Sequence, residues 1–300
     1  MKLSIFTTIL LSLVTTSSFS VEPWLSRSIH LEDALKVWRQ EKRSVPARLG
    51  VHDVSFFGHK ILLKDYLSQS VDSPPLMLVS PHGSSVSQLI VSKRDGIHPD
   101  QKINSLTVGI FEEDFEEAVQ TWQRKSIKII NLSLGMRSAE VVGHLNAFID
   151  DGGIVIASAG NSRERLGEHP KDYYKNFKGI LVGASDGQGK PTSFSQFLPG
   201  KTIWAPGEIS SLRTQKILYK ISPRLEPTEL DDNLKVQDHH FGMTSGAAPI
   251  VTGIVLLALQ INPNLTQAQI NHLLVKSSTA PHGVPFLHAA NFLKLVRDNR

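Results

Sequence analysis

The chain has 300 residues, of which 32 are Lys or Arg, 28 are Asp or Glu and none is Cys. The lack of cysteine excludes a cysteine nucleophile and any cysteine-bound metal site. The net charge of +4 is spread without a basic block, so we expect a mixed, solvated surface and no nucleic-acid partner.

The first 20 residues have the pattern of a secretory signal peptide. Lys2 is their only charge, a short apolar stretch follows, and Ser18 and Ser20 supply small residues for a cleavage site. A membrane anchor is the alternative, but Thr and Ser interrupt the apolar stretch, which is also short for a stable span. We therefore expect a secreted or periplasmic protein that has no membrane contact once residues 1–20 are removed.

The remaining chain is long enough for one large α/β domain. Residues 21–47 are polar and mixed, with a helix expected at 31–38, and we interpret them as an N-terminal segment or a short prosegment. Residues 48–300 are interpreted as a single domain, with an irregular surface insertion at 208–238 that could hold a hairpin.

From residue 48 onward, short aliphatic runs alternate with amphipathic ones. Runs that are apolar on both faces and separated by helices indicate a mostly parallel sheet covered on both sides. The expected fold is therefore α/β, with three αβα layers around a mostly parallel central sheet. The expected strands are 48–53, 75–80, 105–110, 127–134, 153–160, 179–185 and 201–206, and the expected helices are 84–92, 112–124 and 138–150.

The predicted helix 112–124 is acidic at its start and carries an apolar stripe. We interpret the stripe as facing the core, with the acids favoured by the helix dipole, and prefer this interpretation to a metal site. The stripe consists of Phe111, Phe115, Ala118, Val119 and Trp122.

Ser245 precedes a run, 247–261, that is apolar on nearly every side and predicts a helix buried all round. The run has roughly fifteen residues, fewer than the about 20 that a bilayer requires. Because Pro249 is tolerated only near a first turn, the helix should start close to Ser245. Free backbone N–H groups at that point can stabilise a negative oxygen. The alternative is that Ser245 or Thr244 is only an N-cap.

Five segments carry motifs that occur together in one family of enzymes. They are "LGVHDVSFFGH" (49–59), "PHGSSVSQLI" (81–90), "IINLSLG" (129–135), "GGIVIASAGNS" (152–162) and "MTSGAAP" (243–249). In this order they resemble the aspartate motif (the weakest match), the histidine helix, the substrate-binding strands with the oxyanion-hole asparagine, and the serine motif of the subtilisin-like serine proteases, the subtilase family. The segments follow the family's order, and the resemblance covers about residues 48–290.

The resemblance implies a subtilisin-like fold and the following roles. Ser245 would be the nucleophile, His82 its base, Asp53 the residue that orients His82, and Asn161 a donor of the oxyanion hole. The substrate would be a peptide or protein in extended conformation, the chemistry would need no cofactor, and we expect a monomer. Relatives often hold structural calcium, but no acidic cluster here is specific enough to assign a site, and we assign no metal ligands. The substrate-binding residues implied are Ser133, Leu134, Gly135, Ser158, Ala159 and Gly160.

The sequence departs from the family pattern next to two of these residues. Met243 stands where the family has Gly, Gly246 stands where it has Met, and Val54 and Ser55 follow Asp53 where a Gly is usual. Two hypotheses remain: an active serine endopeptidase, or a catalytically inactive subtilisin-like protein that binds peptides or proteins. All four chemical groups are present, which favours the enzyme.

Two other patterns suggest different chemistry. "GASDG" (183–187) has the spacing of an α/β-hydrolase elbow around Ser185, but that motif needs a helix directly after the serine, and the following "QGKPTSF" predicts a turn and a loop. We interpret Ser185 as structural. The pairs His52 with His59 and His239 with His240 could suggest a metal, but no metal-binding His spacing accompanies them.

Overall fold

A computed structural model describes residues 23–41, 45–54, 82–91, 96–98, 101–163, 165–166, 173–207, 212–215, 236–239 and 241–300. The predicted signal peptide at 1–20, the predicted strand at 75–80, His59 and His240 lie outside the described residues. These sequence predictions therefore stay predictions.

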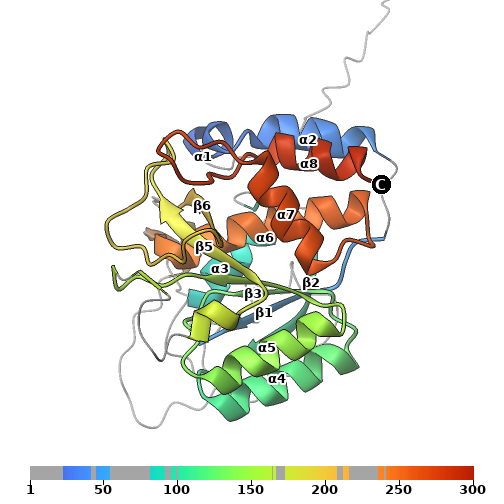
Figure 1. Cartoon of the computed structure of the whole chain (residues 1–300), viewed down its shortest axis with the longest axis vertical. Helices are drawn as coiled ribbons and strands as arrows, with labels where there is room; N and C mark the ends of the chain where they lie inside the picture. The colour runs from blue at the N-terminus through green and yellow to red at the C-terminus, as the bar shows by residue number, and fades with distance from the viewer. Residues whose placement is uncertain are drawn as a thin grey trace, which may run out of the picture.

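A six-stranded parallel sheet forms the centre of the fold (Figure 1). Its strands are short aliphatic runs that are buried on both faces, as expected for a parallel sheet between helical layers. The spatial order is β2-β1-β3-β4-β5-β6, and every neighbouring pair is parallel. The strands are β1 (Leu49–Asp53), β2 (Ile103–Val108), β3 (Ile129–Leu132), β4 (Ile154–Ser158), β5 (Ile180–Ser185) and β6 (Thr202–Pro206).

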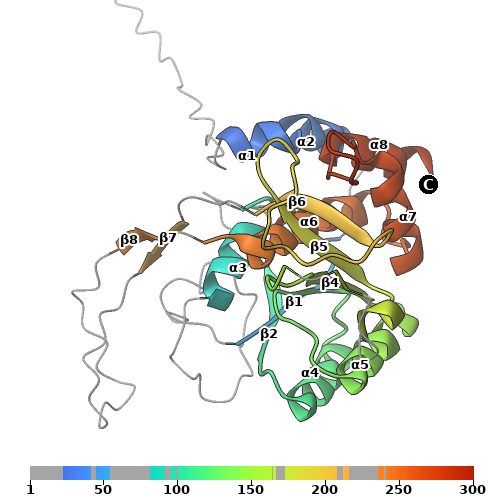
Figure 2. The same ribbon diagram turned by 60° about the vertical axis from the view of Figure 1, so that its left-hand side comes forward.

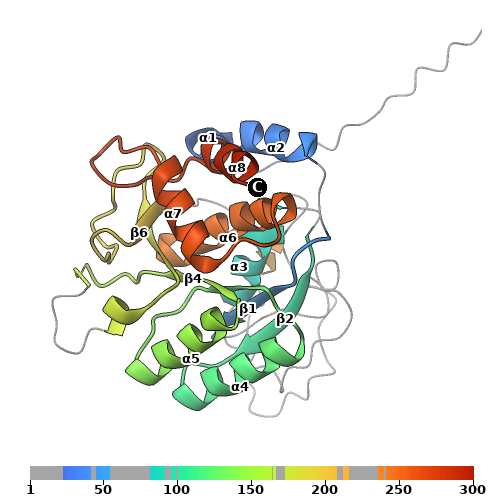
Figure 3. The same cartoon turned by 45° about the vertical axis from the view of Figure 1, so that its right-hand side comes forward.

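Helices cover both faces of this sheet, which confirms the predicted αβα fold (Figures 1 and 3). One face carries α4 (Glu112–Arg124) and α5 (Ala139–Asp150), with the short 3-10 helix η1 (Tyr173–Asn176) beside α5. The opposite face carries α3 (His82–Val91), α6 (Met243–Ile261), α7 (Gln267–Ser277) and α8 (Ala289–Asp298). Helices α7 and α8 were not expected from the sequence.

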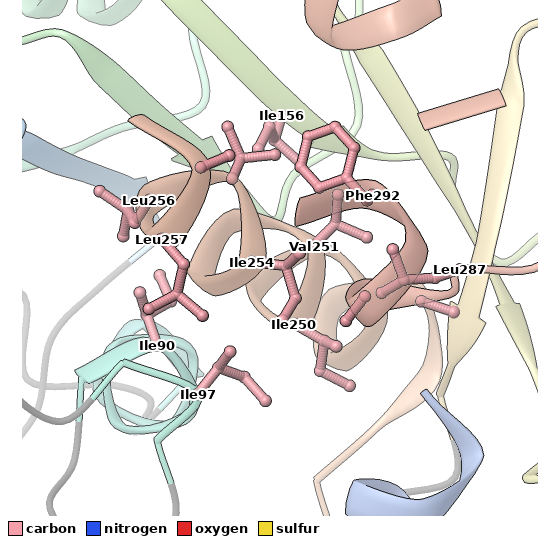
Figure 4. Packing of buried hydrophobic residues seen from close by; sticks show 14 of the residues in the cluster. Ile90, Ile97, Ile156, Ile250, Val251, Ile254, Leu256, Leu257, Leu287 and Phe292 are labelled. Atoms are coloured by element: carbon pink, nitrogen blue, oxygen red, sulfur yellow. The ribbon is translucent and has the colours of Figure 1, made fainter. Parts of the chain in front are cut away.

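Helix α6 forms the centre of the larger hydrophobic core (Figure 4). It begins at Met243, close to Ser245 as predicted, and ends at Ile261. Its 19 residues are apolar, and the helix is long enough to cross a membrane. Its burial identifies it as a core helix, since 94% of its most apolar 18-residue stretch is buried inside the protein. The surrounding side chains labelled in Figure 4 include Ile90, Ile97, Ile156, Leu287 and Phe292.

Helix α4 packs through the predicted stripe with one exception. Phe115, Ala118, Val119 and Trp122 are buried, but Phe111 is 62% exposed. Phe111 precedes the first turn, where the carboxylate of Asp114 accepts its backbone N–H at 2.9 Å. The stripe was therefore predicted correctly within the helix and wrongly at its first member.

The N-terminal segment packs into the same core as the sheet. Its helices are α1 (Pro23–Ser28) and α2 (Leu31–Gln40), and α2 lies along α8 (Figures 1 and 3). The Trp38 indole N–H donates to the Gln260 side chain near the end of α6 at 2.9 Å, and the Ala289 N–H donates to the carbonyl of Ile29 at 3.0 Å. This part of the chain thus contacts α6 near its last residues, whereas Ser245 lies in its first turn.

The segment predicted as an insertion contains an antiparallel hairpin, which confirms that prediction. Strands β7 (Leu212–Gln215) and β8 (Val236–His239) pair with each other rather than with the main sheet. Figure 2 shows them beside the body of the molecule, on the side of α3.

Candidate active site

The predicted site residues meet at one edge of the sheet. Asp53 is the last residue of β1 and Ser158 is the last residue of β4, while Asn161 follows β4 and the segment 133–135 follows β3. Strands β1, β3 and β4 are parallel neighbours, so their carboxyl ends form a single edge. Ligands of open α/β sheets bind at that edge.

Asp53 and His82 are joined by a hydrogen bond. His82 is the first residue of α3, and its Nδ1 lies 2.7 Å from Oδ1 of Asp53. The same carboxylate oxygen accepts the backbone N–H of Val54 at 2.8 Å. The Asp53 side chain is fully buried, whereas 26% of the His82 side chain is exposed. With the proton of a neutral ring held on Nδ1, the Nε2 of His82 is the nitrogen that can accept a proton.

The surroundings of His82 raise its pKa. Burial lowers the pKa of His82, but the hydrogen bond to Asp53 and the Asp53 charge outweigh that effect, so the pKa lies above its ordinary value of 6.5. The ring also makes an edge contact with Phe241, with the centroids 5.3 Å apart. Phe241 lies one residue before Gly242, the N-cap of α6, so this contact places the imidazole near the amino end of the serine helix.

Ser245 lies in the first turn of α6, on a tightly packed backbone. The Met243 N–H donates to the carbonyl of Gly207, just beyond β6, at 2.5 Å. A Cβ at Gly207 would lie 2.8 Å from the carbonyl oxygen of Met243 and 2.5 Å from the Cβ of Ala184. Only glycine allows this close approach, which fixes the start of α6 against the ends of β5 and β6.

Two reciprocal hydrogen bonds join Ser245 to Ser133. The Ser245 hydroxyl donates to the carbonyl oxygen of Ser133 at 3.3 Å, and the Ser133 hydroxyl donates to the carbonyl oxygen of Ser245 at 3.1 Å. The predicted nucleophile and the first predicted substrate-binding residue therefore lie in direct contact. In this structure the Ser245 hydroxyl is directed at the end of β3.

Asn161 is held by Thr244, the residue before the serine. Its side-chain oxygen accepts the Thr244 backbone N–H at 3.1 Å and the Thr244 hydroxyl at 2.8 Å. The Thr244 hydroxyl oxygen in turn accepts the N–H of Gly160 at 3.2 Å. Because the Asn161 oxygen faces Thr244, its amide nitrogen is directed away from Thr244, and Asn161 itself is exposed. An amide held in this way can donate to an oxygen in the site.

The two predicted substrate-binding segments lie side by side. The Ser158 hydroxyl donates to the Leu134 carbonyl at 3.5 Å, which connects the segment after β4 to the segment after β3. Gly160 has φ of 102°, and a Cβ there would overlap the side chain of Gln196. Gly135 has more room, since the nearest atom to a Cβ there is the Tyr174 hydroxyl at 3.6 Å. Ala159 is buried between Ser158 and Gly160.

Met243 adopts a left-handed backbone, the region of conformational space that favours glycine. Its φ is 60°, and the residue is 44% exposed. A non-glycine residue in this region costs about 1–3 kcal/mol. The methionine noted in the sequence therefore leaves backbone strain two residues before Ser245.

Replacing Met243 by Gly is expected to raise the free energy of unfolding by up to about 1 kcal/mol, since relief of strain exceeds the entropy cost of glycine. Met243→Ala is the matched control, because it removes the same side chain and keeps the strained φ. Urea denaturation of the three proteins measures the difference. Equal stability of the Gly and Ala variants would show that the turn stores no strain.

The alternative site residues have structural surroundings. Ser185 ends β5, its hydroxyl is buried, and the described residues that follow form a turn rather than a helix. His52 is fully buried, and its Nδ1 lies 2.8 Å from the hydroxyl of Thr107. Burial lowers the pKa of His52 to about 4, which keeps the ring neutral at physiological pH. Within the described ranges, no three His, Asp or Glu residues gather as metal ligands would, and no calcium site is assigned.

Sequence reasoning missed three residues that hold the site together. Thr244 was considered only as a possible N-cap, and neither Asn131 nor Thr252 was considered at all. Asn131 is fully buried in β3, where its amide nitrogen donates to the Ser133 hydroxyl at 3.0 Å. A polar residue inside the aliphatic run "IINL" was the available signal, because buried polar groups need specific partners.

Comparison with known proteins agrees with this geometry. A family model described as the subtilase family matches residues 68–290, which is well over half of the chain. The M-protease of Shouchella clausii (strain KSM-K16) is 30% identical over 155 residues, covering 48% of this chain and 33% of the relative. Subtilisin BL of Lederbergia lenta is 29% identical over 161 residues, covering 51% of this chain and 49% of the relative. The matched region thus spans less than half the length of these relatives.

Solved structures of low sequence identity share the fold. The structure of the subtilase cytotoxin SubAB superposes with a TM-score of 0.69 at 18% identity, covering 93% of this chain and 97% of that chain. The nisin leader peptidase NisP from Lactococcus lactis superposes with a TM-score of 0.65 at 15% identity, covering 90% and 93%. The fold and the family match lead to the same conclusion: the chain belongs to the subtilase family.

Proposed function

We propose that this protein is a secreted serine endopeptidase that hydrolyses peptide bonds through Asp53, His82 and Ser245, with Asn161 in the oxyanion hole. The single observation that carries the proposal is the 2.7 Å hydrogen bond between the Nδ1 of His82 and the fully buried carboxylate of Asp53. This bond fixes both the orientation and the tautomer of an imidazole at the edge of the sheet where the Ser245 helix begins.

In the proposed reaction, the Ser245 hydroxyl leaves the Ser133 carbonyl and turns to the Nε2 of His82. Its oxygen attacks the scissile carbonyl as its proton passes to His82, and the charge on His82 is balanced by Asp53. His82 then gives that proton to the departing amine, which leaves an acyl group on Ser245. Water, activated by the same histidine, hydrolyses the ester and regenerates the hydroxyl.

The negative oxygen formed in the first step needs donors at the start of α6. We assign this role to the Asn161 side-chain amide and to the Ser245 backbone N–H. The first turn of a helix leaves backbone N–H groups without an intrahelical acceptor, and its dipole favours negative charge. The contact of the Asn161 oxygen with Thr244 supports the assignment, because it turns the amide nitrogen outward.

The proposed substrate is an extended peptide or protein segment. The segments 133–135 and 158–160 each continue from a parallel strand, so their backbone groups can pair with an added strand. Structural neighbours include proteins described as the nisin leader peptidase and as a lanthipeptide protease, both of which act on peptides by name. We further propose that residues 1–20 direct export, that the mature protein is a monomer in the periplasm or outside the cell, and that the reaction uses no cofactor.

A catalytically inactive peptide-binding protein is the competing function, and a fluorophosphonate probe separates the two. We expect the probe to label the folded protein at Ser245, with the site identified by peptide mass spectrometry. The reagent reacts only with an activated serine, so labelling must disappear after heat denaturation. If the native protein stays unlabelled while a control serine protease reacts, the protein is not a serine hydrolase and the binding function is favoured.

Asn161→Ala is expected to reduce kcat by about 10² to 10³, the range measured in subtilisin for loss of one oxyanion donor. The KM should change little, since the donor acts on the transition state and not on the bound substrate. Steady-state hydrolysis of a peptide substrate measures both constants. Because the Asn161 oxygen also anchors Thr244, Asn161→Asp is the informative control: it keeps that acceptor and removes the donor, so kcat should fall similarly. A normal kcat in either variant would place the oxyanion hole elsewhere.

A further inference from the structure

Pro249 leaves the carbonyl of the predicted nucleophile without its helical partner. In a regular helix the N–H of residue 249 would donate to the carbonyl of Ser245, but proline has no N–H. Pro249 lies inside α6 and not at its first position. The Ser245 carbonyl instead accepts the Ser133 hydroxyl at 3.1 Å. A side chain from the segment directly after β3 thus replaces a backbone hydrogen bond at Ser245 itself.

The Ser133 hydroxyl is in turn oriented by a buried chain of hydrogen bonds. The Asn131 amide nitrogen donates to the Ser133 hydroxyl at 3.0 Å, so the Ser133 proton is left for the Ser245 carbonyl. The Asn131 side-chain oxygen accepts the Thr252 hydroxyl at 2.8 Å. Asn131 and Thr252 are fully buried, and Ser133 is 3% exposed. The chain therefore starts and ends on α6 and passes through the carboxyl end of β3.

Asn131 lies among aliphatic side chains in the sheet, where filling space alone would not explain the presence of an amide. Its register neighbours are Val51 in β1 and Ile156 in β4, and Ile130 and Leu132 flank it in β3. A buried amide in aliphatic surroundings is unfavourable unless its donors and acceptors are used. Here the oxygen and the nitrogen bind two different elements, in a direction that determines where the Ser133 proton points.

We propose that Asn131 is a positioning residue: it orients the Ser133 hydroxyl, which holds the Ser245 carbonyl and thereby fixes the nucleophile relative to the end of β3. Thr252, which lies further along α6, fixes the Asn131 amide by donating its hydroxyl proton to the amide oxygen. The inference rests on the proposed function of Ser245, and it assigns no contact between Asn131 and substrate. Loss of the chain lets the first turn of α6 move, and displacement of a reacting group by about 1 Å can cost about 10²-fold in rate.

Asn131→Asp is the most specific test, because it keeps the shape and reverses the hydrogen bond. A carboxylate accepts the Ser133 proton and so withdraws it from the Ser245 carbonyl. We expect kcat to fall about 10- to 100-fold with KM changed less than about twofold, as expected when the nucleophile is misplaced. Thr252→Val should lower kcat in the same way, and Thr252→Ser, which keeps the hydroxyl, should recover most of the loss.

Thr202→Val is the control for a purely structural effect. Thr202, the first residue of β6, is also buried, and its hydroxyl hydrogen-bonds to the backbone of Leu198 rather than to any residue of α6. We expect this variant to lose thermal stability with no change in kcat. If the Asn131 and Thr252 variants lose Tm as Thr202→Val does but keep the wild-type kcat, the positioning role is refuted.

Hydrogen exchange provides a second measurement that does not require an active enzyme. The Gly246 N–H donates to the Gly242 carbonyl at 2.9 Å in the first turn of α6. In Asn131→Asp we expect the Gly246 amide hydrogen to exchange at least about tenfold faster than in the wild type, because its protection reports local opening of the first turn. In Thr202→Val the exchange rate of this amide should be unchanged. Unaltered protection in Asn131→Asp overturns the inference even if the protein proves to be inactive. Faster exchange in a protein without hydrolase activity would instead refute only the proposed function.

Discussion

Ser245→Ala is expected to lower kcat by about 10⁶-fold, the size of the loss measured in subtilisin when its nucleophile is removed. The residual rate comes from the oxyanion donors and from substrate binding, which the substitution leaves in place. KM should stay close to the wild-type value, since the Ser133 carbonyl and the segments 133–135 and 158–160 remain available to a substrate. Hydrolysis of a peptide substrate and fluorophosphonate labelling both measure the effect.

Ser185→Ala is the matched control for that experiment. Ser185 belongs to the competing "GASDG" pattern, and its buried hydroxyl has no hydrogen-bond partner among the described residues. We expect this variant to keep the wild-type kcat. If Ser185→Ala loses activity while Ser245→Ala hydrolyses the substrate normally, Ser185 is the nucleophile and the proposed site is refuted.

Asp53→Asn is expected to lower kcat by about 10⁴-fold, as the equivalent change does in the trypsin triad. An asparagine amide can donate to Nδ1 and thereby place the remaining proton of His82 on Nε2. In that tautomer His82 cannot accept the Ser245 proton, although the side chains keep their positions. The comparison requires kcat for the variant and the wild type at a pH above the pKa of His82.

The same variant should move the acid limb of the pH–rate profile. Neutral His82 is the active base, so activity is lost as the pH falls through its pKa, which Asp53 raises above 6.5. Without the Asp53 charge, the limb should shift to lower pH. Asp150→Asn is the control, because this carboxylate pairs with Lys178 on the exposed surface and should leave the limb unmoved. A limb that shifts equally in both variants, or in neither, contradicts the Asp53–His82 assignment.

Much of the fold could be predicted from the pattern of apolar residues along the sequence. Aliphatic runs at 48–53, 127–134, 153–160, 179–185 and 201–206 each contain a strand, because short runs buried on both faces are typical of parallel sheets. The expected helix stripe at α4 failed only at Phe111, where the chain had not yet entered the helix. The start of α6 was predicted close to Ser245 and lies at Met243, although Pro249 lies deeper in the helix than its first turn.

The candidate site was predictable as a set of residue types and not as a set of contacts. The resemblance to the subtilase family, which rests on short local motifs, identified Asp53, His82, Asn161 and Ser245 as candidates. Their expected places at strand ends and helix starts are also local features of the sequence. The hydrogen bonds that hold these residues, from His82 to Asp53, from Thr244 to Asn161 and between Ser245 and Ser133, depend on the strand order.

Only the tertiary structure decided how the Ser245 backbone is held. Ser133 and Ser245 are 112 residues apart in the chain, yet they exchange two hydrogen bonds because β3 ends beside the first turn of α6. No local pattern encodes such a pair, since hydrogen bonds act over about 3 Å and depend on which elements pack together. The sequence therefore determined which chemical groups reach the edge of the sheet, and the packing of α6 on the strands decided which of them bind one another.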